Sequence, residues 1–241
     1  MKYGGRAFLG IFIAVILTIG WSPSFAMWTG NIFFGQVKSL YNVTLAQQLY
    51  RHAVSPLFGQ KVPAYAYHQL SRTYFIKGDL PQSIEYAKKE LQLYPEHTRT
   101  YYILGLTYGY LNMLPEAIEA FSVYIEHHPE TWAGRNDKAW LQFRMGDISG
   151  ALATIEPAAV YYKTVPWVQN TYCNLLINSN RFSDAETVCM QARELIDNMT
   201  EEGWGRSYPG NDPRTYATGL QAMKISINKN IEILSAQKAG E

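Results

Sequence analysis

A pattern that recurs every 34 residues between residues 64 and 197 constrains the fold of this chain more than any other feature. One position of the pattern is always small, and it is occupied by Ser71, Gly105, Ala139 and Cys173. A second small position is occupied by Ser83, Ala117, Ala151 and Ala185. Repeats of this length are typical of stacked helical hairpins, because one hairpin cannot bury its own apolar face. The pattern therefore predicts an all-α solenoid.

Turn-forming residues lie between the two small positions of each repeat. Gly78, Asn112, Gly146 and Asn180 follow the first apolar segment in successive repeats. Glycine and asparagine tolerate the left-handed backbone that often ends a helix. Each repeat is therefore expected to contain two antiparallel helices joined at this turn.

The second repeat carries the most complete motif, which consists of Tyr101, Leu104, Gly105, Tyr108, Ala117, Phe121, Tyr124 and Pro129. This motif resembles the tetratricopeptide repeat family. The resemblance implies four hairpins, at residues 64–97, 98–131, 132–165 and 166–197. The two later hairpins depart from the motif, because Arg135, Lys138 and Gln169 replace its aromatic or leucine residues.

Helical segments are also predicted on both sides of the repeats. In the segment 29–63, apolar spacing predicts a leading helix from Gln36 to about Ala53. Residues 198–212 are expected to form a long loop, which is either functional or packs Trp204 and Tyr208 over the last repeat. Asp212 and Pro213 are typical of a helix start, so the segment 213–241 is expected to form a C-terminal capping helix and tail.

The N-terminal segment, residues 1–28, is strongly apolar. Lys2 and Arg6 precede an apolar run from residue 7 to residue 21. A run extended to residue 28 is long enough for an uncleaved transmembrane anchor, which makes the chain a single-pass membrane protein. Alternatively, the run is a signal peptide cleaved after Ala26, and the chain is secreted. Both alternatives place the repeats outside the cytoplasm, and a buried helix of a soluble fold is the third alternative.

Cys173 and Cys189 are the only cysteines, and both lie in the fourth predicted hairpin. They are placed almost symmetrically about the predicted turn, so they should stand level on facing helices. Two alternatives remain, a disulfide in an oxidising compartment or two reduced thiols that pack as small core residues.

No arrangement of residues indicates catalysis. The five histidines are scattered, and the sequence has no phosphate-binding glycine loop or nucleophile motif. The net charge of +1 argues against nucleic acid as a partner. We therefore expect a protein that is not an enzyme and that has no cofactor, metal or small-molecule substrate.

In the tetratricopeptide repeat family, the first helix of each repeat lines the concave face on which partners bind. The resemblance implies that this face carries Tyr65, His68, Arg72, Phe75, Arg99, Tyr102, Leu106, Tyr110, Asn136, Trp140, Phe143, Arg144, Trp167, Asn170, Asn174 and Asn178. The last three form a stripe of amides that either binds the backbone of an extended peptide or faces solvent.

These features together predict a scaffold for protein–protein interaction, tethered to a membrane and exposed outside the cytoplasm. Its expected partner is a peptide or helix of a cell-envelope protein, and its expected role is that of an assembly factor or complex subunit. An alternative is a structural subunit held by its N-terminal transmembrane helix, with the solenoid as a spacer.

Overall fold

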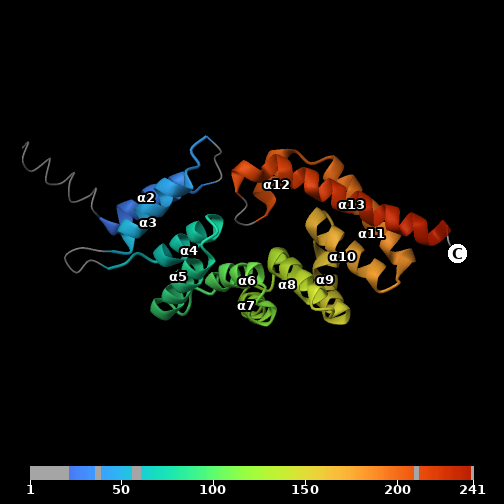
Figure 1. The fold of residues 1–241 in the computed structure, drawn as a ribbon, viewed down its shortest axis with the longest axis horizontal. Helices are drawn as coiled ribbons and strands as arrows, with labels where there is room; N and C mark the ends of the chain where they lie inside the picture. Colours follow the sequence, from blue (N-terminus) through green and yellow to red (C-terminus); the bar gives the residue numbers. More distant parts are fainter. Residues whose placement is uncertain (1–21, 36–38, 56–60, 209–211, 240–241) are drawn as a thin grey trace, which may run out of the picture. The chain divides into compact units, whose positions relative to one another are not determined.

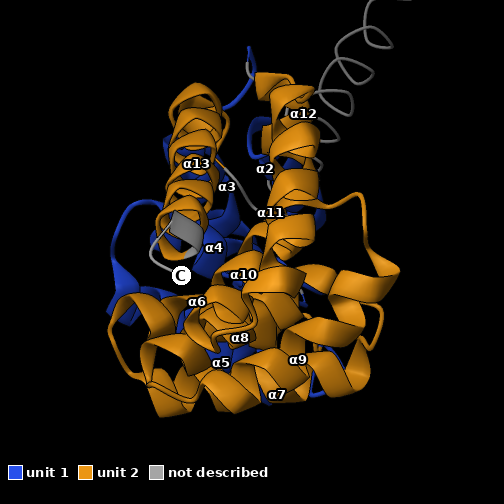
Figure 2. Ribbon diagram, turned by 90° about the vertical axis from the view of Figure 1, so that its right-hand side faces the viewer, with its two compact units in different colours: residues 1–97 blue, residues 98–241 orange. Residues whose placement is uncertain are grey.

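The computed structural model describes residues 22–35, 39–55, 61–208 and 212–239 (Figure 1). Within these ranges every regular element is a helix, so the all-α fold predicted from the sequence is confirmed. The chain divides into two compact units, residues 1–97 and residues 98–241 (Figure 2).

Unit 1 contains two helical hairpins. The first pairs α2 (Pro23–Phe33) with α3 (Val43–Ala53), and the second pairs α4 (Ala66–Ile76) with α5 (Leu80–Leu93). Helix α3 also packs against α4, which joins the hairpins into one core. The second hairpin coincides with the repeat expected at residues 64–97, and the first adds a hairpin that the 34-residue pattern does not include.

Helix α2 changes the interpretation of the N-terminal segment. Residues 23–28 were expected to belong to a membrane segment or signal, but they form the first half of α2 and pack on α3. Pro23, Ala26 and Gly30 form the buried face of α2, and Ala26 packs with Ala53. The apolar run of residues 7–21 lies outside the described ranges. Among the helices that are described, none combines the length and hydropathy needed to cross a bilayer.

The leading helix begins later than the sequence pattern predicted, and its predicted start at residues 36–38 lies outside the described ranges. Helix α3 starts at Val43, and Leu40 and Tyr41 precede it in non-helical backbone. The start is fixed by Asn42, whose side-chain oxygen accepts a 3.0 Å hydrogen bond from the backbone amide of Leu45. An asparagine cap of this kind supplies a partner to an amide that has none inside the helix.

Unit 2 contains three hairpins and a C-terminal segment. The hairpins are α6 (Thr100–Tyr110) with α7 (Leu114–His127), α8 (Trp132–Arg144) with α9 (Ile148–Tyr161), and α10 (Pro166–Asn178) with α11 (Phe182–Asp197). They are followed by α12 (Glu201–Ser207), η1 (Pro213–Thr215) and α13 (Tyr216–Ala239). The second helix of one hairpin packs on the first helix of the next, and α13 packs on α11 in the same way.

The small positions of the pattern are sites of close helix packing. A Cβ atom added to Gly105 would lie 2.8 Å from the ring of Phe121, whose side chain is fully buried. The predicted turns also have the expected backbone, because φ is 80° at Gly78, 61° at Asn112, 82° at Gly146 and 60° at Asn180. The repeat pattern therefore correctly predicted both the close helix packing and the left-handed turns.

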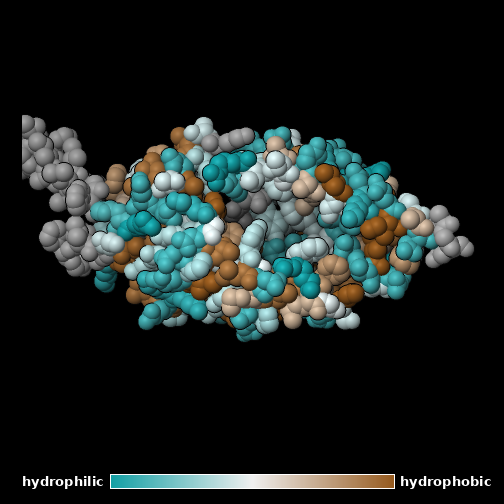
Figure 3. Space-filling view, in the orientation of Figure 1, coloured by the Kyte–Doolittle hydropathy of each residue, from teal (hydrophilic) through white to brown (hydrophobic). Residues whose placement is uncertain are grey.

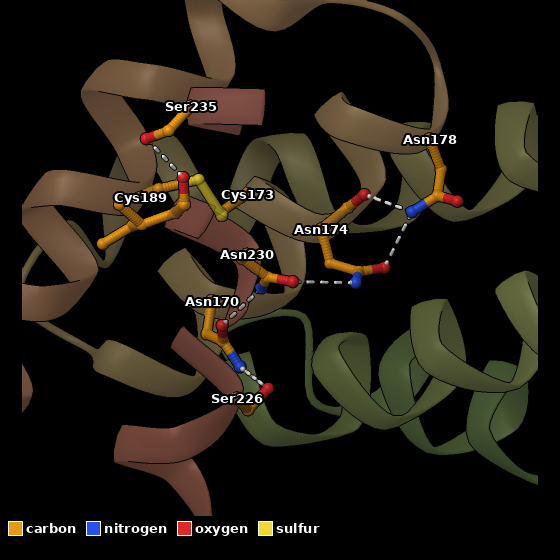
Figure 4. Close-up of a disulfide and its surroundings, with 9 residues drawn as sticks. Asn170, Cys173, Asn174, Asn178, Cys189, Ser226, Asn230 and Ser235 are labelled. Carbon is orange, nitrogen blue, oxygen red and sulfur yellow. Dashed lines mark hydrogen bonds between the residues drawn. A yellow bond between two sulfur atoms is a disulfide. The ribbon is translucent and has the colours of Figure 1, made fainter. Parts of the chain in front are cut away.

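A disulfide joins the two helices of the last hairpin. Cys173 on α10 is bonded to Cys189 on α11, and their Cα atoms are 5.1 Å apart (Figure 4). Of the two alternatives for the cysteines, the structure therefore shows the bonded one. Both cysteines are fully buried and pack with Leu176, Ala185 and Leu234. A bridge across a loop of this size contributes about 3 kcal/mol in the chain-entropy treatment.

The segment predicted as a long loop, residues 198–212, contains the short helix α12. Thr200 caps it by accepting a 3.0 Å hydrogen bond from the amide of Gly203, and Glu201 and Glu202 lie in its first turn. Gly203 and Gly205 are unfavourable in a helix, but a good cap and acidic residues near the N-terminus favour one. Asp212 caps the following helical segment as predicted.

Candidate functional site

The first helices of the three hairpins in unit 2 share one face, which we call the A-helix face. Helix α8 contacts both α6 and α10. The hydroxyl of Tyr102 on α6 donates a 2.9 Å hydrogen bond to Asp137 on α8, and Thr171 on α10 donates a 2.7 Å bond to Asn136 on α8. These helices carry most of the predicted binding residues, namely Tyr102, Leu106, Tyr110, Asn136, Trp140, Phe143, Arg144, Trp167, Asn170, Asn174 and Asn178.

One end of the A-helix face holds the side chain of Tyr208, which follows α12. The ring of Tyr208 lies 5.1 Å from the ring of Trp132, edge to face, and 5.5 Å from the ring of Trp167. Its hydroxyl donates to the carboxylate of Asp137 and accepts a 3.4 Å hydrogen bond from the amide of Asn136. We call this arrangement of Trp132, Asn136, Asp137 and Trp167 the tyrosine pocket.

The pocket contains a carboxyl group, that of Asp137, which is held by phenol hydroxyls and shielded from water. Burial is the main reason that the pKa of Asp137 rises from its ordinary value to about 6, and hydrogen bonds from Tyr208 and Tyr102 oppose that rise. The pKa values of both tyrosines are raised well above 10, first by burial and then by the charge of Asp137. Among the described residues, no basic side chain forms an ion pair with Asp137. The phenol hydroxyls therefore provide its stabilising contacts.

Helix α12 and Tyr208 together form a segment, residues 201–208, that we call the strap. The buried ring of Trp204 lies 5.5 Å from that of Trp167, so the strap packs over the last repeat. It also rests on α13, where a Cβ atom at Gly219 would lie 2.0 Å from the ring of Trp204. Of the two alternatives for residues 198–212, the described part of the segment shows the packed one.

The asparagine stripe contacts α13 and is not an open peptide-binding surface (Figure 4). Asn230 on α13 donates a 3.0 Å hydrogen bond to Asn170 and accepts a 3.4 Å bond from Asn174. Asn170 also donates to Ser226, and Asn178 donates to the backbone carbonyl of Asn174. Asn170 and Asn174 were predicted to bind a partner peptide, but their side-chain amides bond to α13 instead. Helix α13 packs on the last hairpin in the way that the first helix of a further repeat would.

The other end of the A-helix face is exposed. Trp140 is 46% exposed and packs on Phe143, with 5.5 Å between the ring centroids. The guanidinium of Arg144 donates a 2.7 Å hydrogen bond to the side chain of Asn112 and approaches the carbonyl of Gly109 at 3.5 Å. Tyr110, at the end of α6, is 73% exposed. We call the four side chains Tyr110, Trp140, Phe143 and Arg144 the Trp140 patch. Figure 3 shows hydrophobic residues at the surface over α6.

The remaining predicted residues have other surroundings. Arg99 is exposed and is the N-cap residue of α6. In unit 1, Tyr65 stacks on His97 at 3.8 Å, and the guanidinium of Arg72 lies 4.8 Å from the ring of Phe34. The backbone amides of Tyr65 and His68 donate to the buried carboxylate of Glu90. His68 and Phe75 are half-buried, so the unit 1 residues contribute to the packing of that unit.

Asp137 and Tyr208 are the main residues of this face that the sequence pattern did not assign to a site. Asp137 is adjacent to the predicted residue Asn136, but it stands in the polar run Arg135-Asn136-Asp137-Lys138, so no local pattern marks it as a site residue. Tyr208 was named only within the predicted loop. Its contact with Asp137 spans 71 residues of sequence, which no local pattern reports.

Comparison with known proteins agrees with the fold. Residues 64–97 match the family described as tetratricopeptide repeat. No curated protein sequence matches the chain. Similar solved structures include MamA from AMB-1, which is 16% identical with a TM-score of 0.58 and covers 74% of this chain and 93% of MamA.

Two further structures show the same likeness. TTC0263, a thermophilic TPR protein from Thermus thermophilus, has a TM-score of 0.56 and 16% identity, with coverage of 83% of this chain and 100% of TTC0263. YrrB, described as a TPR protein with an unusual peptide-binding site, has a TM-score of 0.53 and 16% identity, with coverage of 73% and 92%. The matched repeat and these likenesses show that the chain has the fold of a tetratricopeptide repeat protein.

Proposed function

We propose that the chain is a non-enzymatic scaffold that binds a segment of another protein at the Trp140 patch. The observation that carries the proposal is the exposure of aromatic and arginine side chains on a face that is otherwise covered by the strap and α13. Tryptophan, tyrosine and arginine dominate the binding energy of protein interfaces. The peptide-binding site described for YrrB, which has the same fold, also supports the proposal.

The chemistry of the patch favours a mainly apolar segment with an acidic residue beside it. Trp140 and Phe143 form an aromatic platform for an aliphatic or aromatic side chain. The guanidinium of Arg144 is held in place by Asn112 and is exposed, so it can pair with a carboxylate of the partner. A peptide or the apolar face of a helix meets both conditions.

Photo-crosslinking tests the binding surface. A photoreactive phenylalanine analogue is placed at position 140 and, as a control, at the exposed position 190 on α11. We expect a protein adduct from position 140 that is lost in the double variant Phe143→Ala, Arg144→Ala. Equal adducts from positions 140 and 190, or an adduct from position 140 that persists in the double variant, would show that the patch is not the binding surface.

We further propose that the chain is tethered to a membrane and acts outside the cytoplasm, as an assembly factor or subunit of a cell-envelope complex. The apolar run of residues 7–21 supports a tether. The outer face of α2 supports it too, because Phe25, Trp28 and Ile32 are exposed and the rings of Phe25 and Trp28 lie 5.8 Å apart. Tryptophan is enriched where proteins meet the membrane interface. The disulfide suits an oxidising compartment.

The tether is tested by fractionation and by the mass of the mature chain. A tethered chain stays with the membranes after carbonate extraction and has the mass of the unprocessed sequence. A soluble chain that starts at Met27 would indicate cleavage after Ala26 and secretion. Crosslinks from position 17 or 28, with none from position 140, would favour the alternative of a structural subunit held by its N-terminal segment.

A further inference from the structure

The tyrosine pocket matches every polar requirement of a phenol. A phenol hydroxyl can both donate and accept a hydrogen bond. Asp137 accepts from the hydroxyl of Tyr208, and the side-chain amide of Asn136 donates to it. The orientation of that amide is fixed because its oxygen accepts a 2.7 Å bond from Thr171. The indole rings of Trp132 and Trp167 contact the ring of Tyr208.

The same groups discriminate against side chains that resemble tyrosine. A phenylalanine in the pocket would leave the carboxylate of Asp137 with one partner fewer, and sites built around a hydroxyl strongly reject analogues without it. A phosphotyrosine would bring two negative charges toward Asp137, for which the structure provides no ion pair among the described residues. The pocket is therefore selective for an unmodified phenol.

In the described part of the chain, two polar groups where the strap packs on α13 lack hydrogen-bond partners. The indole nitrogen of Trp204 and the hydroxyl of Tyr216 are buried, and neither has a hydrogen-bond partner among the described residues. Native structures satisfy most such groups, so each one lowers the stability of the closed strap. Helix α12 spans only Glu201–Ser207, and Glu201, Glu202 and Arg206 are exposed. Only Trp204 and Gly205 of α12 are buried, and a helix this short opens more easily than a repeat core.

We infer that the tyrosine pocket is a receptor site for a tyrosine side chain, filled within the chain by Tyr208 and available to a tyrosine of a partner segment that displaces the strap. This inference rests on the proposed function, because it identifies a second recognition site for the partner on the A-helix face. Tyr208 competes with a partner tyrosine for the pocket, and its effective concentration there is high because it belongs to the same chain. A partner therefore displaces it most readily when it also binds the Trp140 patch.

The binding test uses peptides with the sequence of residues 200–208 that end in tyrosine, phenylalanine or phosphotyrosine. Fluorescence anisotropy measures their binding to the full chain carrying Tyr208→Ala, which vacates the pocket, and circular dichroism checks its fold. We expect the tyrosine peptide to bind at least about tenfold more tightly than the other two. Adding Asp137→Ala to this chain should remove the preference. A folded Tyr208→Ala chain that binds the tyrosine and phenylalanine peptides equally, or binds neither, overturns the inference.

Native-state hydrogen exchange of the unmodified chain gives an independent result, even if Tyr208→Ala does not fold. We expect the amides of residues 204–208 to exchange through an opening that occurs well before global unfolding, unlike those of α10. Exchange of the strap only through global unfolding would show a permanent structural joint and would overturn the inference. Crosslinking from position 140 is unaffected by either result, so the failure of this inference and the failure of the proposed function are distinguishable.

Discussion

The two ends of the A-helix face of unit 2 differ although the same helices form them. At one end, Trp167 is buried against the strap and Asp137 is bonded to Tyr208. At the other end, Trp140 is 46% exposed. The family resemblance alone assigned both tryptophans to one binding surface. The difference shows that part of this surface is already occupied by the chain itself, so a partner would meet the Trp140 patch first.

Replacing Trp167 or Trp140 by alanine should produce the largest difference in stability between the two ends of the A-helix face. Trp167→Ala removes a ring that contacts Trp132, Trp204 and Tyr208, and it should lower the free energy of unfolding by about 3–5 kcal/mol. Trp140→Ala should cost less than about 1 kcal/mol, because its side chain is half exposed. Urea unfolding measures both values. Similar losses for the two variants would contradict the distinction between a packed end and an open end.

The disulfide should make the next largest contribution to the free energy of unfolding near the packed end. Changing Cys173 and Cys189 together to alanine should lower the free energy of unfolding by about 3 kcal/mol, because the bridge restricts the unfolded chain. Denaturant unfolding of the double variant and of the unmodified chain in reducing buffer provides two readings of the same effect. Crosslinking from position 140 should persist in the double variant under conditions where it remains folded. Its loss there would show that the open end depends on the bridge.

The buried carboxyl of the tyrosine pocket should make stability depend on pH. The pKa of Asp137 is about 6 in the folded chain, above its ordinary value of 3.8, so folding takes up a proton between these values. The stabilising contribution is fully present below about pH 4 and is lost as the pH rises through 6, and its size is roughly 2–3 kcal/mol. Asp137→Asn should remove this component from a plot of unfolding free energy against pH. An unchanged plot would mean that Asp137 does not titrate in this range.

The smallest difference in stability is expected between Asn230, which joins α13 to α10, and Asn178, which lies at the end of the asparagine stripe. Asn230→Ala breaks bonds to Asn170 and Asn174 at a buried position and should cost about 1–2 kcal/mol. Asn178→Ala changes an exposed residue and should cost less than about 0.5 kcal/mol. Thermal unfolding of the two variants side by side measures the difference. An equal cost would indicate that α13 is not held by these amides.

The repeated part of the fold could be predicted from the sequence because its signals are local. The left-handed turns at Asn112 and Gly146 and the packing of Gly105 on Phe121 each depend on residues within one hairpin. The pairing of Cys173 with Cys189 depends on the turn that lies between them. A fixed period is therefore enough to place these features.

The two ends of the chain were harder to predict because their signals have two interpretations. Pro23 and Ala26 fit a membrane segment as well as the buried face of α2, and only the contact with α3 distinguishes the two. The strap depends on contacts between residues far apart in the sequence, such as Tyr208 with Asp137. The candidate site was therefore predicted as a set of residues, but the division into a packed end and an open end was not.

Hydrogen exchange of the full chain, measured with and without the partner identified by crosslinking, shows whether the A-helix face binds the partner and whether binding displaces the strap. We expect binding to protect the ends of α6 and α8 around Tyr110 and Trp140 and to increase exchange in residues 204–208 of the strap. Protection around Tyr110 and Trp140 with no change in the strap would support the binding surface but not displacement of Tyr208. Protection confined to α2, or no change in α6 and α8, would contradict the claim that the A-helix face binds the partner.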